Sequence, residues 1–168
     1  MCYHLWIVSP LSLTEIRSML PREFAADVAP APEQARFRPL LAGAPAVRLR
    51  VGGCACPLLL AGDAEDAHHL RRRYAVLGLP RDRIIAAIES HRRGNPTPGD
   101  PAARRAALAR FVVEHARNAG PTLYYLGFGP DPSAAVGNRA VAETTSAAGV
   151  RAAADTWLPE GRLIEVTR

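Results

Sequence analysis

The segment that most constrains the fold is YHLWIVS, residues 3–9, which is almost entirely apolar and rich in aromatic and β-branched side chains. Such a run is typical of a β-strand that is covered on both faces of its sheet. The chain has 168 residues, which is enough for one domain with a sizeable core. We therefore expect a single domain over residues 1–168, with layers on both sides of a sheet.

Helix and strand signals follow along the chain. Ser12 and Glu15 form a capping-box pattern at the start of a helix that Pro21 ends. Gly78 separates two later helical patterns, which predict an αα-hairpin. These two helices and a third are expected at about 63–77, 80–94 and 101–119. Strands are expected at 24–28, 47–51, 122–128 and the C-terminal RLIEVTR.

Strands near both ends and helices between them predict an α+β fold, a small layered domain. We expect a mixed or antiparallel sheet with about three to four helices, including the central αα-hairpin. Apart from its short strand, the Pro-rich segment 22–46 reads as irregular, and GNPTPGDP at 94–101 reads as a connector. The segment 130–155 is rich in small residues and favours neither helix nor strand.

Composition narrows the class of protein. The chain is 48% hydrophobic and 22% charged, as in ordinary globular proteins. It has a net charge of +5 and is arginine-rich, because all 21 cationic residues are arginine. This bias, together with abundant alanine, fits the coding preference of a GC-rich genome, so net basicity alone is weak support for nucleic-acid binding.

Targeting signals are absent from the sequence. No apolar run reaches the roughly 20 residues that span a bilayer, so we expect no transmembrane segment. The N-terminus MCYHLWIVSP has no basic leader and no small-residue cleavage signal. Three cysteines are an odd number, which argues against a disulfide framework. We therefore expect a cytoplasmic protein.

The segment VRLRVGGCACPLLL, residues 47–60, places Cys54 and Cys56 one residue apart. The alternation over 47–51 predicts a strand with one solvent-facing side, and an unbroken strand would point both thiols to that side. A bulge at Gly52 and Gly53 would turn them inward. Both cysteines would then be small buried side chains at the end of a strand.

A Cys-x-Cys pair can also bind a soft metal such as zinc or copper. Eleven residues separate Cys56 from His68 and His69, so the candidate metal ligands are Cys54, Cys56, His68 and His69. Cys2, His4 and His91 are further residues that could complete a tetrahedron. A redox role for the pair is a second chemical hypothesis, although its spacing differs from the CxxC of thioredoxin-like proteins.

The segment 68–93 resembles a helix-turn-helix. Apolar residues around the turn match that motif, namely Leu77, Leu79, Ile84 and Ile88. Tyr74 departs from it, since the motif has a small residue four positions before the turn glycine. The resemblance implies nucleic-acid contacts through Arg81, Arg83, Arg92 and Arg93. The alternative is a plain αα-hairpin with solvated arginines.

Catalytic motifs are missing from the sequence. It contains no G-x-S-x-G, no H-E-x-x-H and no P-loop. We therefore lean against an enzyme and expect a non-catalytic accessory or interaction protein, such as an accessory subunit, that docks on a larger protein assembly. The alternatives are a thiol or metal-binding protein that uses the Cys-x-Cys pair, and a nucleic-acid binder that uses the hairpin at 68–93.

Overall fold

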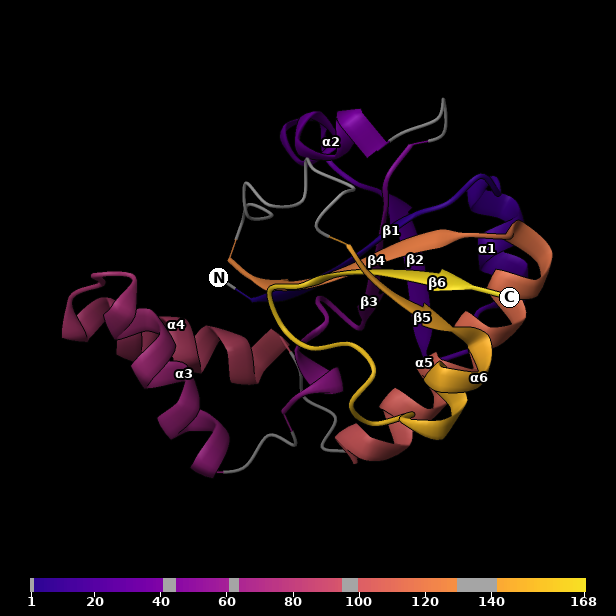
Figure 1. Ribbon diagram of the computed structural model, residues 1–168. Helices are drawn as coiled ribbons and strands as arrows, with labels where there is room; N and C mark the ends of the chain where they lie inside the picture. The colour runs from indigo at the N-terminus through magenta and orange to yellow at the C-terminus, as the bar shows by residue number, and fades with distance from the viewer. Residues whose placement is uncertain (1, 41–44, 61–63, 95–99, 130–141) are drawn as a thin grey trace.

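The computed structural model describes residues 2–40, 45–60, 64–94, 100–129 and 142–168. Its centre is a sheet with the strand order β2-β3-β1-β4-β6-β5. Neighbouring strands are antiparallel except for β5 and β6, which are parallel. The fold is thus α+β with a mixed sheet, as the sequence predicted, and helices lie on both sides of it (Figure 1).

The first strand, β1 (Tyr3–Val8), lies inside the sheet. It pairs with β3 (Val47–Val51) on one side and with β4 (Thr122–Phe128) on the other. Tyr3, Leu5 and Ile7 belong to the larger hydrophobic core, and Trp6 and Val8 to a smaller one. The prediction that this strand is covered on both faces is therefore confirmed.

The two faces of the sheet are covered by different numbers of helices. The larger core takes side chains from α1 (Leu13–Met19), α5 (Pro101–Ala119) and α6 (Ala147–Ala152), among others. The smaller core includes Phe37 of α2 (Ala31–Phe37) and Leu40 of the 3₁₀ helix η1 (Arg38–Leu40). The expected capping box is present, because Ser12 accepts a hydrogen bond from the Glu15 backbone and Glu15 accepts one from Ser12.

The predicted αα-hairpin consists of α3 (Ala64–Val76) and α4 (Arg81–Gly94). Gly78 lies in the turn with a φ of 74°, a conformation that favours glycine. Leu70 and Tyr74 of α3, with Ile84 and Ile88 of α4, are buried in the larger core. The two helices otherwise extend away from the sheet as an arm (Figure 1).

Two helices of the structure are not predicted by the sequence. Six α-helices, not three to four, are present in the described part of the chain. The segment 22–46 contains the expected strand β2 (Phe24–Val28) but also α2 and η1. Its prolines suggested irregular structure, yet α2 has proline in its first turn, where a missing N–H costs nothing. The other missed helix, α6, begins after Ser146, whose side chain caps Gly149 N–H.

Near the C-terminus, β5 (Glu143–Ser146) and β6 (Leu163–Thr167) complete the sheet. The sequence predicted β6 and gave no assignment for β5. The prediction for 130–141 and most of the predicted connector at 94–101 lie outside the described residues. In the part of the chain that is described, no helix is both long and apolar enough to cross a membrane.

Candidate thiol site

The chain turns sharply between β3 and the two cysteines. The Val51 backbone N–H donates to the Cys54 carbonyl over 2.8 Å, and Gly52 in this turn has a φ of 68°. The strand therefore ends in a tight turn instead of continuing through a bulge. The short 3₁₀ helix η2 (Cys56–Leu58) follows, and the Ala55 N–H donates to the Tyr3 carbonyl over 2.9 Å. This turn carries both thiols to the start of β1.

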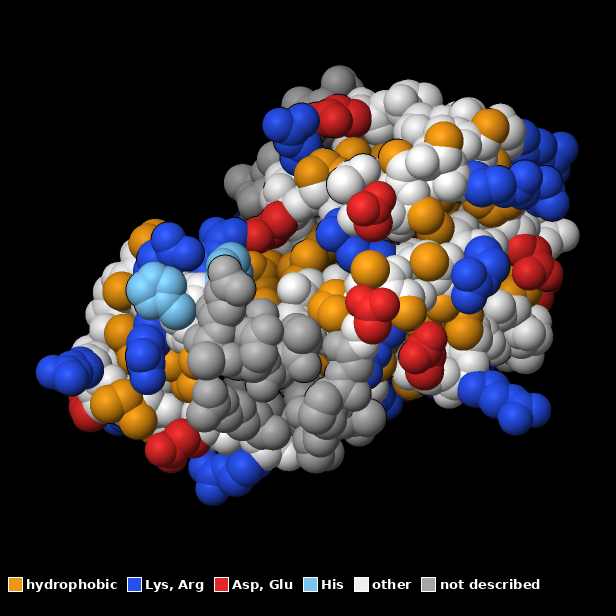
Figure 2. Space-filling model, turned by 90° about the horizontal axis from the view of Figure 1, so that it is seen from below, with side chains coloured by type: hydrophobic (Ala, Val, Ile, Leu, Met, Phe, Trp, Pro, Cys, Tyr) orange, Lys and Arg blue, Asp and Glu red, His pale blue; other side chains and the backbone are white. Residues whose placement is uncertain are grey.

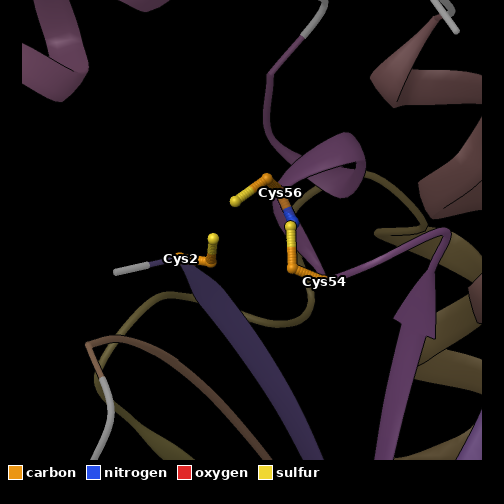
Figure 3. A group of neighbouring side chains, drawn as sticks. All are labelled: Cys2, Cys54 and Cys56. Carbon is orange, nitrogen blue, oxygen red and sulfur yellow. The ribbon is translucent and has the colours of Figure 1, made fainter. Parts of the chain in front are cut away.

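Three cysteines meet at that point. The Sγ atoms of Cys2, Cys54 and Cys56 all lie within 4.8 Å of one another. Figure 3 shows Cys2 at the start of β1 and the other two on the segment after β3, with the sulfur atoms close together. Cys54 is 5% exposed, Cys56 is 0% exposed and Cys2 is half-buried. No disulfide joins them.

Backbone N–H groups are directed at two of the sulfurs. The Tyr3 N–H donates to Cys56 Sγ over 3.2 Å, and the Cys56 N–H lies 3.4 Å from Cys54 Sγ. Hydrogen bonds of this kind stabilise sulfur that carries negative charge, as it does in a metal thiolate. These two contacts give the sulfurs of Cys56 and Cys54 one backbone N–H donor each.

The surroundings of Cys2 and Cys56 favour the protonated form of these two thiols. Hydrogen bonding with Cys54 and burial raise the pKa of the Cys2 thiol. The thiols of Cys2 and Cys54, followed by burial, raise the pKa of Cys56 far above its ordinary range. Three thiolates so close together would repel one another in a buried place. A bound cation removes that obstacle, and its binding releases protons.

The structure brings together only part of the predicted ligand set. Cys54 and Cys56 join Cys2, which the sequence analysis named only as a residue that could complete the set. His68 is exposed, and His69 Nε2 lies 2.8 Å from the Tyr3 hydroxyl. Among the described residues, no histidine or carboxylate joins the three sulfurs. The side chain of His91 lies outside the description.

A polar network connects α3 of the arm to Tyr3 of β1 and to Glu160, next to the thiols. The Tyr3 hydroxyl lies 2.8 Å from His69 Nε2 and 3.2 Å from Glu160 Oε2, and Arg73 forms an ion pair with Glu160. Burial, with the nearby Glu160 carboxylate, raises the pKa of Tyr3 to about 12. Burial and then the three cysteines raise the pKa of Tyr74 to about 12. Sequence reasoning missed these neighbours, because they come from three distant segments.

The predicted nucleic-acid contacts lie on α4 of the arm. Arg81, Arg83 and Arg93 are exposed, while the side chain of Arg92 is outside the description. Ile84 and Ile88 are buried as a helix-turn-helix requires, but Leu77 is 48% exposed. Tyr74 is buried at the position where that motif has a small residue. Nucleic-acid binding by this hairpin stays a prediction.

A buried serine and histidine meet elsewhere in the core. His115 Nε2 lies 2.8 Å from Ser9 Oγ, and His115 Nδ1 lies 2.7 Å from the Tyr124 hydroxyl. Burial lowers the pKa of His115 to about 4, so the ring is neutral at pH 7. Ser9 is 4% exposed and His115 is 0% exposed. This trio therefore satisfies buried polar atoms and offers no substrate a path to the serine.

A groove between α5 and α6 gathers positive charge. Arg110, Arg117 and Arg151 line it together with Glu114, and its remaining lining is apolar. The arginines are exposed. The groove holds neither a nucleophile nor a metal-ligand cluster among its described residues.

Comparison with known protein families, with curated proteins and with solved structures finds no match for this chain. Any function must therefore be argued from its own residues.

Proposed function

We propose that this protein binds a soft metal or metalloid ion through Cys2, Cys54 and Cys56, and that it acts as a binding protein and not as an enzyme. The observation that carries the proposal is the mutual approach of three sulfurs to within 4.8 Å from two segments far apart in the sequence. Soft ions such as Cu(I) and Zn²⁺ are the partners that thiolates select.

The spacing of the sulfurs supports a single ion. Zn–S bonds are about 2.3 Å long, so two sulfurs on one ion are about 4 Å apart in tetrahedral or trigonal geometry. The separations here are no larger than 4.8 Å, so only small side-chain shifts are needed to close the site. The two N–H···S contacts support the charged form of the sulfurs.

The cysteine count supports a reducing location. The chain has three cysteines, an odd number that does not fit a framework of structural disulfides. The proposal therefore includes the cytoplasm as the place of action.

Elemental analysis of the loaded protein tests this proposal. The untagged chain is incubated with Cu(I) or Zn²⁺ under a reductant that is not a thiol, and unbound metal is removed. We expect about one ion per chain for the wild type and none for Cys54→Ser. His68→Ala is the matched control, because this exposed histidine was a predicted ligand but lies apart from the sulfurs. Equal metal content in wild type and Cys54→Ser overturns the proposal.

Docking on a protein partner is a second candidate function, and exposed apolar side chains on the arm favour it. Val76 is 86% exposed, Leu77 is 48% exposed and Ile85 is 46% exposed. Figure 2 shows hydrophobic and arginine side chains beside one another on the arm, at the left of the molecule. Contiguous apolar surface is a property of interaction sites.

Size-exclusion chromatography of extracts from the cells that make the protein tests docking. A partner would move the wild type to a mass above 18.0 kDa. Val76→Glu should then return the chain to its own mass, since a charge at the centre of an apolar contact is costly. Elution of the wild type as a bare chain at all salt concentrations would contradict docking.

A further inference from the structure

We propose that the ion suited to this site is trivalent and thiophilic, of the arsenite class, and that it is held by three thiolates, with no fourth ligand from the described residues. This inference rests on the proposed function and names the class of ion that the same three sulfurs select.

The balance of charge in a buried site favours a trivalent ion. Three thiolates carry three negative charges, which Cu(I) reduces to two, Zn²⁺ to one and a trivalent ion to zero. Cys54 and Cys56 lie in the larger hydrophobic core, with Leu58 and Tyr74 in the same cluster. An uncompensated charge in such surroundings is costly, so the neutral complex fits best.

The number of ligands also favours a trivalent ion. Structural zinc sites are almost always tetrahedral with four protein ligands. The described residues supply three sulfurs and no fourth side chain to this group. Trivalent arsenic keeps a lone pair and forms three bonds in a pyramid, so three sulfurs complete its coordination. The three sulfur atoms lie within 4.8 Å of one another, and Figure 3 shows them close together between the start of β1 and the segment after β3.

The binding step is a ligand exchange that needs no oxidant. Arsenous acid, As(OH)₃, reacts with the three protonated thiols. Three As–O bonds break and three As–S bonds form, and each thiol proton leaves with a hydroxide as water. The oxidation state of arsenic does not change, and neither the reactants nor the products carry net charge. The half-buried Cys2 is the first thiol that an incoming molecule meets.

Intact mass spectrometry under native conditions counts the bonds. The probe is sodium arsenite, added to the untagged protein in a reductant that contains no thiol. Three bonds add one arsenic atom and remove three hydrogens. Two bonds leave a hydroxyl on arsenic and remove only two. We expect the three-bond mass for the wild type and the two-bond mass for Cys2→Ser, with affinity reduced at least about 100-fold, since loss of an outer-shell partner already costs 10–100-fold.

Competition with zinc separates this inference from the proposed function. We expect arsenite to displace Zn²⁺ from the wild type at equal concentration, while His68→Ala behaves as the wild type. A two-bond adduct on the wild type, or zinc that resists arsenite, overturns the trivalent assignment and leaves ion binding intact. Failure of arsenite, Zn²⁺ and Cu(I) alike to bind overturns both proposals.

Discussion

The backbone N–H of Tyr3 donates to the Sγ atom of Cys56 over 3.2 Å, although 53 residues separate the two along the chain. Tyr3 is the first residue of β1, and Cys56 is the first residue of η2. The contact therefore forms only when β1 is in place beside the end of β3. The thiol site and the centre of the fold are assembled together, so ion binding and folding must be linked.

An ion that binds the three sulfurs should stabilise the fold. The unfolded chain does not hold the sulfurs together, so the ion favours the native state. At a free ion concentration of 100 times Kd, we expect the free energy of unfolding to rise by about 2.7 kcal/mol. Urea unfolding with and without Zn²⁺ or arsenite measures this gain.

Cys2→Ser provides the comparison for that measurement. This residue is half-buried at the edge of the core, so its replacement should change the ion-free stability little. It should nevertheless remove most of the ion-induced gain, because one of three ligands is lost. An equal gain in wild type and variant would mean that the ion binds elsewhere.

Acid should weaken the fold through His115. The ordinary pKa of 6.5 falls to about 4 in the buried site, so the folded ring stays neutral while the unfolded ring takes up a proton below pH 6.5. The stabilising contribution is thus complete above pH 6.5 and is lost as the pH falls to about 4. The loss for this residue is about 3 kcal/mol.

Urea unfolding of the wild type and His115→Gln at several pH values between these limits measures that contribution. The variant should have a shallower decline in stability, because glutamine does not titrate. The same substitution at the exposed His68 should leave the decline unchanged. Parallel declines in wild type and His115→Gln would show that other groups cause the acid sensitivity.

The buried Glu33 in helix α2 should contribute to the stability of the fold. Trp6 Nε1 donates to Glu33 over 2.6 Å, and Arg48 pairs with Glu33 at 3.0 Å. Glu33→Ala should lower the free energy of unfolding by about 2 kcal/mol, because it leaves the buried indole N–H without this acceptor. Glu33→Gln should lose less, since its amide oxygen can still accept. Chemical denaturation measures the free energy of unfolding of both variants. Glu23→Ala is the control, and because Glu23 is exposed its replacement should change this energy by less than about 0.5 kcal/mol. An equally small change for Glu33→Ala would contradict the role of Glu33.

The attachment of the arm is testable at Tyr74. This side chain is 1% exposed, and the centre of its ring lies 5.5 Å from the centre of the Phe128 ring in β4. Tyr74→Ala should lower the free energy of unfolding by about 3–5 kcal/mol, as for other buried aromatic residues. Val76→Ala, two residues further along α3, should change stability by less than about 0.5 kcal/mol because Val76 is exposed. Hydrogen exchange of α3 and α4 would show whether Tyr74→Ala releases the arm, and unchanged protection would contradict this attachment.

Local patterns predicted most of the elements. The apolar run of β1, the capping box at Ser12 and the turn glycine Gly78 each depend on residues that are neighbours in the sequence, and each is found where expected. The sequence does not predict helix α2, because several prolines in one segment indicate irregular structure, whereas proline in a first turn is compatible with a helix. The strand β5 was missed because ETTS carries little apolar pattern.

The thiol site could be predicted only in part. Cys54 and Cys56 are visible in the sequence as a local motif. The direction of their side chains depends on the turn at Gly52. The alternation along the strand does not predict that turn, because it allows either an unbroken strand or a bulge. Cys2 joins them through the pairing of β1 and β3, a contact that no local pattern reports. His68 and His69 are predicted ligands because they follow the cysteine pair closely in the sequence. In the structure, helix α3 places them apart from the sulfurs, and His69 contacts the Tyr3 hydroxyl.

Native mass spectrometry of the untagged protein, taken from the cells that make it and kept under a reductant that is not a thiol, shows whether the three sulfurs hold an ion. We expect the 18.0 kDa chain with one soft ion, and much weaker retention of that ion in Cys54→Ser, which keeps only two of the three thiols. A bare chain that takes up no soft ion when arsenite, Zn²⁺ or Cu(I) is supplied would contradict ion binding at the cysteines.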